Sequence, residues 1–282
     1  MNLREIYYRL SPNMRLLARK IYYRPMDIMD SLRGKRNKYV PPKGDIFIGS
    51  GDFEKQGNRQ LDLLKKYIFL KNEDSILDIG CGIGRTAIPL TKYLNKNGRY
   101  EGFDVVEKGI KWCNSRIKKD FPNFNFTYVP LENDLYNNSK NQASKFVFPY
   151  ENDTFHKVFL FSVFTHMQID EIENYLKEIE RVLKPDGYCL ATFFIYNEKT
   201  EKEISDKNKF AFPVKKDGYR LMDEKVKSAN VAISESKLEE MISNTNLSKI
   251  NLIHGYWKSK KDNSSDQDFQ DMLVLKLDTT SK

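Results

Sequence analysis

The chain has 282 residues, of which 40% are hydrophobic and 30% charged, and its formal net charge is +8. This length allows one sizeable α/β domain with additions, and the lack of any run of about 18 apolar residues argues against a transmembrane helix. The three cysteines, Cys81, Cys113 and Cys189, lie too far apart for a metal site, and their odd number is typical of a reduced setting.

The positive charge is concentrated at the N-terminus. Residues 1–38 contain ten Lys/Arg and three Asp/Glu, a net charge of +7, so the remaining residues together carry only +1. A nearly neutral body is unlike a nucleic-acid-binding surface, so we do not expect nucleic acid as a partner. The N-terminus has no signal-peptide pattern, which favours a cytoplasmic protein.

A basic amphipathic helical arm is predicted for residues 1–45, with a break at Ser11-Pro12, an N-cap followed by a first-turn proline. Three interpretations of the arm remain open. It packs on the rest of the chain or on a second subunit, it lies on an anionic inner membrane face, or it binds RNA. The apolar residues that recur at helical spacing are Leu3, Ile6, Tyr7, Leu10, Met14, Leu17, Ala18 and Ile21.

A glycine-rich turn is the most informative feature of the main domain, which we expect to span residues 46–278 before a short tail, residues 279–282. The run 76–86 reads Ile-Leu-Asp-Ile-Gly-Cys-Gly-Ile-Gly-Arg-Thr, a β-type segment that ends in a Gly-x-Gly-x-Gly turn. Glycines allow close backbone approach to a ligand, and the following helix directs its free N–H groups at the turn. The dinucleotide fingerprint has its third glycine one residue later, so the spacing departs from the pyrophosphate-binding form.

This run resembles motif I of the class I S-adenosylmethionine (SAM) methyltransferases, and the order of motifs is similar over about residues 53–274. The resemblance implies SAM as the cofactor, with Asp78 orienting the turn and the amino-acid end of SAM. In this family a leading segment such as residues 48–53 often folds over the cofactor, although a plain loop fits equally well. The cofactor-binding residues implied for the turn are Asp78, Gly80, Cys81, Gly82 and Gly84.

A second strand is predicted over residues 100–105, and it carries Asp104 at its end, 20 residues beyond Gly84. A carboxylate at this distance can accept hydrogen bonds from both ribose hydroxyls. The alternative is that Asp104 caps the helix that begins at Glu107. We count Val105, the next residue, among the cofactor contacts.

The third strand is predicted over residues 124–129. The resemblance implies that the residues just after it pass close to the adenine, and Leu131 and Glu132 are the candidates. Many members of the family carry an aspartate where Pro130 stands, so the sequence departs from the family pattern at this point.

A polar loop, residues 162–167, follows an apolar strand predicted over residues 157–161. Ligands of an open α/β sheet bind beyond the carboxyl ends of its strands, so we expect this loop on the acceptor side. We assign Ser162 to the cofactor and His166 as the general base. The alternative for His166 is a ring held by a backbone hydrogen bond, or a plain substrate contact. The substrate contacts expected here are Phe164, Thr165 and Met167.

A second hallmark of the family is the step from a helix through Leu-Lys-Pro-x-Gly to a strand, here residues 183–187 leading into residues 188–195. The preceding helix has one apolar face, formed by Ile172, Tyr175, Leu176, Ile179, Val182 and Leu183. Residues 196–229 form an insertion of mixed charge, which the family commonly uses as part of a substrate cover.

The last two strands are predicted over residues 248–255 and 270–277, after a helix with Leu238, Met241 and Ile242 on its inner face. The resemblance implies that the first of these strands is parallel and the second antiparallel. The residues after the first and at the start of the second then lie at the same edge of the sheet. The substrate candidates there are Tyr256, Trp257, Gln270 and Asp271.

These patterns predict an α/β fold with a Rossmann-like, seven-stranded, mostly parallel sheet and helices on both faces, a helical arm and a cover insertion after strand five. The function implied is SAM-dependent methyl transfer, by O-methylation, to a small-molecule or glycan- or lipid-linked acceptor. RNA or protein methylation, a SAM-binding regulatory partner and an NAD-dependent oxidoreductase are the alternatives. We expect no metal, and the loop after strand four lacks the Pro-Pro-Tyr-type motif of nucleic-acid amino-methylating enzymes.

Overall fold

The computed structural model describes residues 12–34, 36–49, 51–133, 137–205, 210–258 and 268–278. The first part of the predicted arm, including Ser11, and the predicted tail at residues 279–282 lie outside these ranges. Within the described ranges, no helix combines the length and the apolar composition that crossing a membrane requires.

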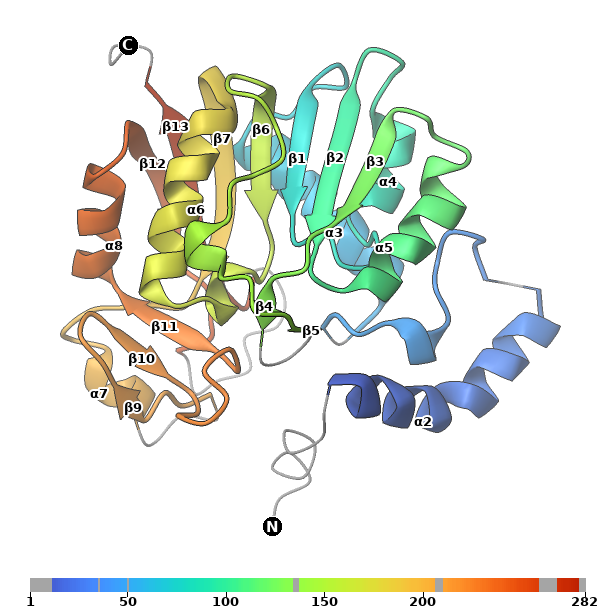
Figure 1. Ribbon diagram of the computed structural model, residues 1–282, viewed down its shortest axis with the longest axis horizontal. Helices are drawn as coiled ribbons and strands as arrows, with labels where there is room; N and C mark the ends of the chain where they lie inside the picture. The colour runs from blue at the N-terminus through green and yellow to red at the C-terminus, as the bar shows by residue number, and fades with distance from the viewer. Residues whose placement is uncertain are drawn as a thin grey trace. The chain divides into compact units, whose positions relative to one another are not determined.

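A seven-stranded sheet is the centre of the fold, in the order β12-β13-β7-β6-β1-β2-β3 (Figure 1). Strand β13 runs antiparallel to both of its neighbours, whereas β1 with β6, β6 with β7 and β2 with β3 pair in parallel. The expected Rossmann-like, mostly parallel α/β sheet is therefore confirmed. The strands are β1 (Ser75–Ile79), β2 (Arg99–Asp104), β3 (Phe124–Tyr128), β6 (Phe155–Leu160), β7 (Leu183–Phe193), β12 (Leu247–Ile253) and β13 (Asp271–Leu277).

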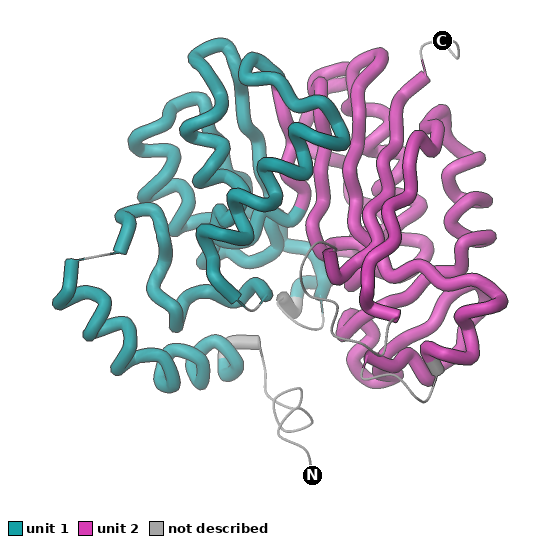
Figure 2. Tube along the Cα trace, turned by 180° about the vertical axis from the view of Figure 1, so that it is seen from behind, with its two compact units in different colours: residues 1–74, 80–139 teal, residues 75–79, 140–282 magenta. Residues whose placement is uncertain are grey.

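The chain divides into two compact units, one of residues 1–74 and 80–139 and one of residues 75–79 and 140–282 (Figure 2). The first unit holds β2, β3 and a small β4–β5 hairpin, Glu132–Asn133 with Asn137–Asn138. Its helical segments are α2 (Pro12–Leu32), η1 (Lys43–Asp45), α3 (Phe53–Tyr67), α4 (Ala87–Tyr93), α5 (Glu107–Cys113) and one π-helical turn, η2 (Asn114–Lys118).

Helix α2 is described from Pro12, the first described residue, so the break predicted at Ser11-Pro12 stays a prediction. Helix α3 begins at Phe53 because the Asp52 carboxylate accepts a hydrogen bond from the backbone N of Lys55 at 2.9 Å.

The second unit holds the other five strands of the sheet together with α6 (Ile169–Val182), α8 (Glu235–Ser243), and the short 3-10 turns η3 (Ala143–Lys145) and η4 (Phe164–His166). Helix α6 starts with a capping box in which Gln168 and Glu171 exchange hydrogen bonds. The apolar faces predicted for both helices are buried, which confirms these two predictions.

The fifth strand starts earlier than the sequence indicates, at Leu183 and not at residue 188, because Leu183 already pairs with Phe155. The register shifts between Phe155 and Lys157, where Asp186 adopts a left-handed φ of 60°. The Pro-Asp-Gly run therefore forms an irregularity inside the strand and not a turn ahead of it.

The insertion after β7 forms a second sheet of four strands, in the order β8-β11-β10-β9. Aromatic residues that looked scattered in the sequence pack into an apolar core of their own, which supports this second sheet. The elements are β8 (Ile195–Tyr196), α7 (Glu201–Ser205), β9 (Val214–Lys215), β10 (Tyr219–Leu221) and β11 (Val231–Ser234). The core residues are Phe194, Tyr196, Ile204, Phe212, Ala232 and Trp257.

Candidate functional site

The glycine turn of the first unit has the backbone geometry that its sequence predicts. Gly80, Gly82 and Gly84 have φ values of 74°, 60° and 84°, in the left-handed region that residues with side chains rarely adopt. The backbone N atoms of Gly80 and Cys81 both donate to the carbonyl oxygen of Phe103, at 2.9 and 3.1 Å. The turn is therefore tied to the end of β2, one residue before Asp104.

The Asp104 carboxylate is buried beside this turn. Its Oδ2 accepts a hydrogen bond from the backbone N of Gly82 at 2.8 Å, and its Oδ1 accepts one from Val106 N at 2.7 Å. Val106, and not Asp104, is the N-cap residue of α5, so the alternative of a simple helix cap does not describe this carboxylate. An ionised carboxylate has about four acceptor positions, so these backbone bonds leave capacity for a further donor such as a hydroxyl.

The charge state of Asp104 is set by its surroundings. Burial raises the pKa of this carboxyl to about 6, although hydrogen bonds from Val106, Gly82 and Val105 act in the opposite direction. Most of these carboxyls are therefore ionised at pH 7, and the negative charge is not paired with a cation in the described contacts of the group. Hydroxyl donors that replace the lost water therefore stabilise the ionised carboxylate strongly.

A segment ahead of α3 contacts the turn, and its position over a bound cofactor stays a prediction. A Cβ added to Gly82 would lie 3.1 Å from the Ile48 side chain. A Cβ on Gly109 of α5 would lie 2.3 Å from the carbonyl oxygen of Gly82 and 3.0 Å from the Phe47 ring. Gly109 was not predicted, although a glycine inside a helix is itself a signal of close backbone packing.

The residues of the first unit fit a nucleoside with two neighbouring hydroxyls. A left-handed glycine turn gives close backbone approach, and a buried carboxylate at the end of the adjacent strand retains acceptor capacity. Of the other predicted contacts, Cys81 and Leu131 are buried, Val105 is partly exposed and Glu132 is exposed in β4. In the second unit, Asp78 is buried in β1, paired in register with Phe159. These contacts stay predictions.

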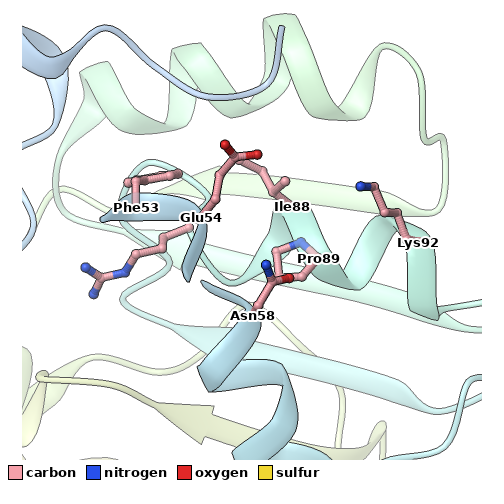
Figure 3. Close-up of a pocket in the computed structure, with 7 residues that line it drawn as sticks. Phe53, Glu54, Asn58, Ile88, Pro89 and Lys92 are labelled. Atoms are coloured by element: carbon pink, nitrogen blue, oxygen red, sulfur yellow. The ribbon is translucent and has the colours of Figure 1, made fainter. Parts of the chain in front are cut away.

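A small pocket near α4 is a separate feature of the first unit. Figure 3 shows its lining, and its volume is about 40 Å³. This volume holds a few water molecules and is too small for a nucleoside. The lining residues are Phe53, Glu54, Asn58, Arg85, Ile88, Pro89 and Lys92.

Two predicted residues of the second unit come together at the loop after β6. The Oγ of Ser162 donates to Oε1 of Gln270 at 2.9 Å, and its backbone N donates to Oγ1 of Thr192 at 2.7 Å. Ser162 has a φ of 61°, which is strained for a residue with a side chain. The loop after β6, the end of β7 and the residue before β13 are thereby linked.

His166 lies at the end of η4 and contacts the insertion. Its Nδ1 lies 2.7 Å from the carbonyl oxygen of Ser228, which can only accept, so Nδ1 carries the proton and Nε2 is left as an acceptor. Burial lowers the pKa of the imidazole, while hydrogen bonds to the backbone at Ser228 and Ala229 act in the opposite direction. The ring is therefore neutral at pH 7. The backbone bond considered as an alternative is present, and it orients the ring.

The remaining substrate candidates differ in their exposure. Tyr256 and Gln270 are partly exposed, whereas Thr165 and Met167 are buried and Phe164 stacks on Phe193 with the ring centroids 4.9 Å apart. The Thr165 hydroxyl is buried and has no hydrogen-bond partner among the described residues. These assignments also stay predictions.

Asp271 and Trp257 form a buried hydrogen-bonded node. The fully buried Asp271 carboxylate accepts hydrogen bonds from Ile195 N at 2.8 Å, Gly255 N at 2.9 Å and Trp257 Nε1 at 2.6 Å. Trp257 is itself only 1% exposed. Because neither side chain presents an open surface, we leave both out of the acceptor site proposed below. Among the described residues, no group of three or more His, Cys, Asp or Glu is placed to hold a metal ion.

The family model and two relatives that match this chain are all described as methyltransferases. Residues 70–246 match the family model described as a methyltransferase domain. An uncharacterized methyltransferase of Schizosaccharomyces pombe is 29% identical over 43% of this chain and 40% of its own length. Phthiotriol/phenolphthiotriol dimycocerosates methyltransferase 1 of Mycobacterium ulcerans is 30% identical over 42% of this chain and 36% of its own length. The chain thus matches less than half the length of these two relatives.

The fold is also similar to that of solved structures. The crystal structure of a Pyrococcus horikoshii protein aligns with a TM-score of 0.52 at 18% identity, and the alignment covers 83% of this chain and 94% of that one. At this level of identity the similarity concerns the fold alone.

Proposed function

Because the chain belongs to the class I SAM-dependent methyltransferases, with SAM as the cofactor, we propose that it methylates an oxygen of a small-molecule, glycan- or lipid-linked acceptor. The bound cofactor supplies a methyl group on a positively charged sulfur. The observation that carries the proposal is the hydrogen bond between Asp104 and the glycine turn, which joins a carboxylate to a backbone cradle.

The first unit supplies the cofactor contacts in this proposal. The Asp104 carboxylate receives the ribose hydroxyls, and Gly80, Gly82 and Gly84 allow the backbone to approach the ligand. Ile48 lies against Gly82 and excludes water from the turn. The other proposed contacts of this unit are Cys81, Val105, Leu131 and Glu132, and Asp78 and Ser162 of the second unit stay predictions from the sequence.

His166 is the proposed general base. An acceptor hydroxyl must lose a proton as its oxygen is methylated, and a neutral imidazole can take it. The carbonyl of Ser228 holds the proton on Nδ1, so Nε2 has the lone pair that this step needs. Gln270 and Tyr256 keep part of their surface open and are the proposed polar contacts of the acceptor.

A lipid-related acceptor is favoured by two observations. The Mycobacterium ulcerans relative is named for dimycocerosates as its substrates. The basic N-terminal segment, with a net charge of +7 over residues 1–38, suits work at the inner face of a membrane. RNA or protein methylation fits less well, because the rest of the chain is nearly neutral.

The proposal is tested by incubating the purified protein with SAM labelled in its methyl group and with separate lipid, glycan, RNA and protein extracts. We expect label in the lipid or glycan fraction, and a loss of that label in the His166→Gln variant. Label only in RNA or protein would contradict the proposed acceptor. Binding of SAM without formation of S-adenosylhomocysteine in any extract would identify a regulatory SAM-binding protein.

A further inference from the structure

Helix α2 turns its polar face toward the first unit. The Asp27 carboxylate accepts hydrogen bonds from the backbone N of Lys43 at 2.6 Å and of Gly44 at 2.9 Å. Asp30 pairs with the Lys43 ammonium at 3.0 Å, and Arg15 is buried. A helix at the surface of a protein normally buries apolar residues, so this orientation is inverted.

The opposite face of α2 is apolar and exposed. We call it the α2 stripe; its members recur at helical spacing and therefore share one side of the helix. These side chains are 52–83% exposed, whereas single exposed apolar residues elsewhere on a protein surface need no explanation. The α2 stripe consists of Met14 (54%), Leu17 (58%), Ile21 (66%), Ile28 (52%) and Leu32 (83%).

Positive charge borders the α2 stripe. Lys20 and Arg24 are exposed on one side of it, and Arg33 lies at its C-terminal end. Just beyond the helix, Arg36, Lys38 and Arg116 line a groove of about 220 Å³ together with Asp30, and Lys38 pairs with Asp120 at 2.8 Å. The Arg116 guanidinium lies 5.2 Å from the centre of the Trp112 ring. Exposed cationic side chains thus adjoin the α2 stripe at Lys20, Arg24 and Arg33.

We propose that the α2 stripe and its basic border form a docking surface for an anionic lipid membrane. Apolar side chains of such a helix enter the region between headgroups and acyl chains, and Lys/Arg side chains contact the lipid phosphates. A second copy of this chain is a poorer occupant, because a symmetric contact would bring two faces of the same positive charge together. The inference deepens the proposed function, since a lipid-linked acceptor lies in the surface to which the helix binds.

The full chain is mixed with vesicles of phosphatidylcholine alone or of phosphatidylcholine with phosphatidylglycerol, and the bound fraction is measured by sedimentation. We expect binding to the anionic vesicles only. The triple substitution Leu17→Glu, Ile21→Glu and Leu32→Glu should weaken it by roughly tenfold or more, because each site is exposed and loses apolar contact with lipid. Reversal of Arg24 and Arg33 to Glu should weaken it by a similar factor, and added salt should weaken binding of the wild type.

The matched control is Val147→Glu, which replaces an apolar side chain that is 67% exposed in the second unit, and we expect it to bind vesicles like the wild type. Wild-type protein that ignores anionic vesicles, or stripe variants that bind them undiminished, would overturn the proposal. So would a wild-type dimer that the triple substitution converts to a monomer, since a second copy would then cover the α2 stripe. Titration with S-adenosylhomocysteine should be the same for all variants, so this result is independent of whether the proposed acceptor is correct.

Discussion

The affinity for the cofactor should depend on pH through Asp104. Its carboxyl has a pKa of about 6, so about one in ten of these groups is ionised at pH 5 and about nine in ten at pH 7. If the ribose hydroxyls require the ionised acceptor, the Kd for S-adenosylhomocysteine rises about tenfold between pH 7 and pH 5, or about 1.4 kcal/mol. An aspartate with an ordinary pKa near 3.8 would remain ionised over this range.

The substitution Asp104→Asn isolates the same carboxylate. Asparagine keeps the shape but places an NH₂ donor against the N–H of Gly82 or of Val106, and it removes the charge that strengthens hydrogen bonds from hydroxyls. The conflict with the N–H weakens the free and the bound protein alike, whereas the lost charge weakens binding by about 1.5–3 kcal/mol. We therefore expect the Kd at pH 7 to rise roughly 10- to 100-fold and its dependence on pH to flatten.

Calorimetric titration with S-adenosylhomocysteine at several pH values measures both effects. Acid unfolding through Asp104 does not confuse the result, because the folded carboxyl binds its proton more tightly than the unfolded one. Acidification from pH 7 to pH 5 therefore favours the folded state as far as this group is concerned. A Kd that is constant from pH 5 to pH 7, or an unchanged Kd in Asp104→Asn, would refute this reasoning. Asp217→Asn, at an exposed site, is the control.

Three further substitutions test other parts of the structure. Gly109→Ala places a Cβ 2.3 Å from a backbone oxygen, and this overpacking costs about 1–3 kcal/mol, so the melting temperature should fall by about 2–10 °C. The control is Gly34→Asn, which has open space around it, and equal melting temperatures of the two variants would contradict the packing. His166→Gln should lower kcat by about 10²–10⁴-fold with unchanged affinity for S-adenosylhomocysteine, and a wild-type rate would exclude it as the base. Asp271→Ala leaves three N–H donors unpaired and should lower the free energy of unfolding, measured in urea, by about 3–5 kcal/mol. Asp217→Ala is the control, and an equally small loss in both variants would argue against the buried node.

The sheet and the glycine turn could be predicted from the sequence because local rules decide them. Gly80, Gly82 and Gly84 can adopt left-handed backbone at little cost because they lack a Cβ, and all three adopt it. The apolar period of α6 likewise identified the face that the structure buries. In both cases the signal lies within a few consecutive residues.

The rest depends on contacts between distant segments, which no local pattern encodes. The position of Ile48 over Gly82 and the bond between His166 and Ser228 join residues that are 34 and 62 positions apart. Asp271 was expected to contact substrate because the antiparallel last strand starts at the acceptor edge of the sheet, whereas the structure buries it among three N–H donors from other segments. The sequence left open which face of α2 packs on the chain, and the hydrogen bonds from Lys43 and Gly44 to Asp27 show that a polar face does so.

A crystal structure of the complex with S-adenosylhomocysteine tests the central claim most directly. We expect both ribose hydroxyls within about 2.7–3.2 Å of the Asp104 carboxylate oxygens, with the amino-acid end of the ligand against the backbone of residues 80–84. A ligand whose sugar contacts other residues, or a crystal grown at saturating ligand with none at this turn, would contradict the account.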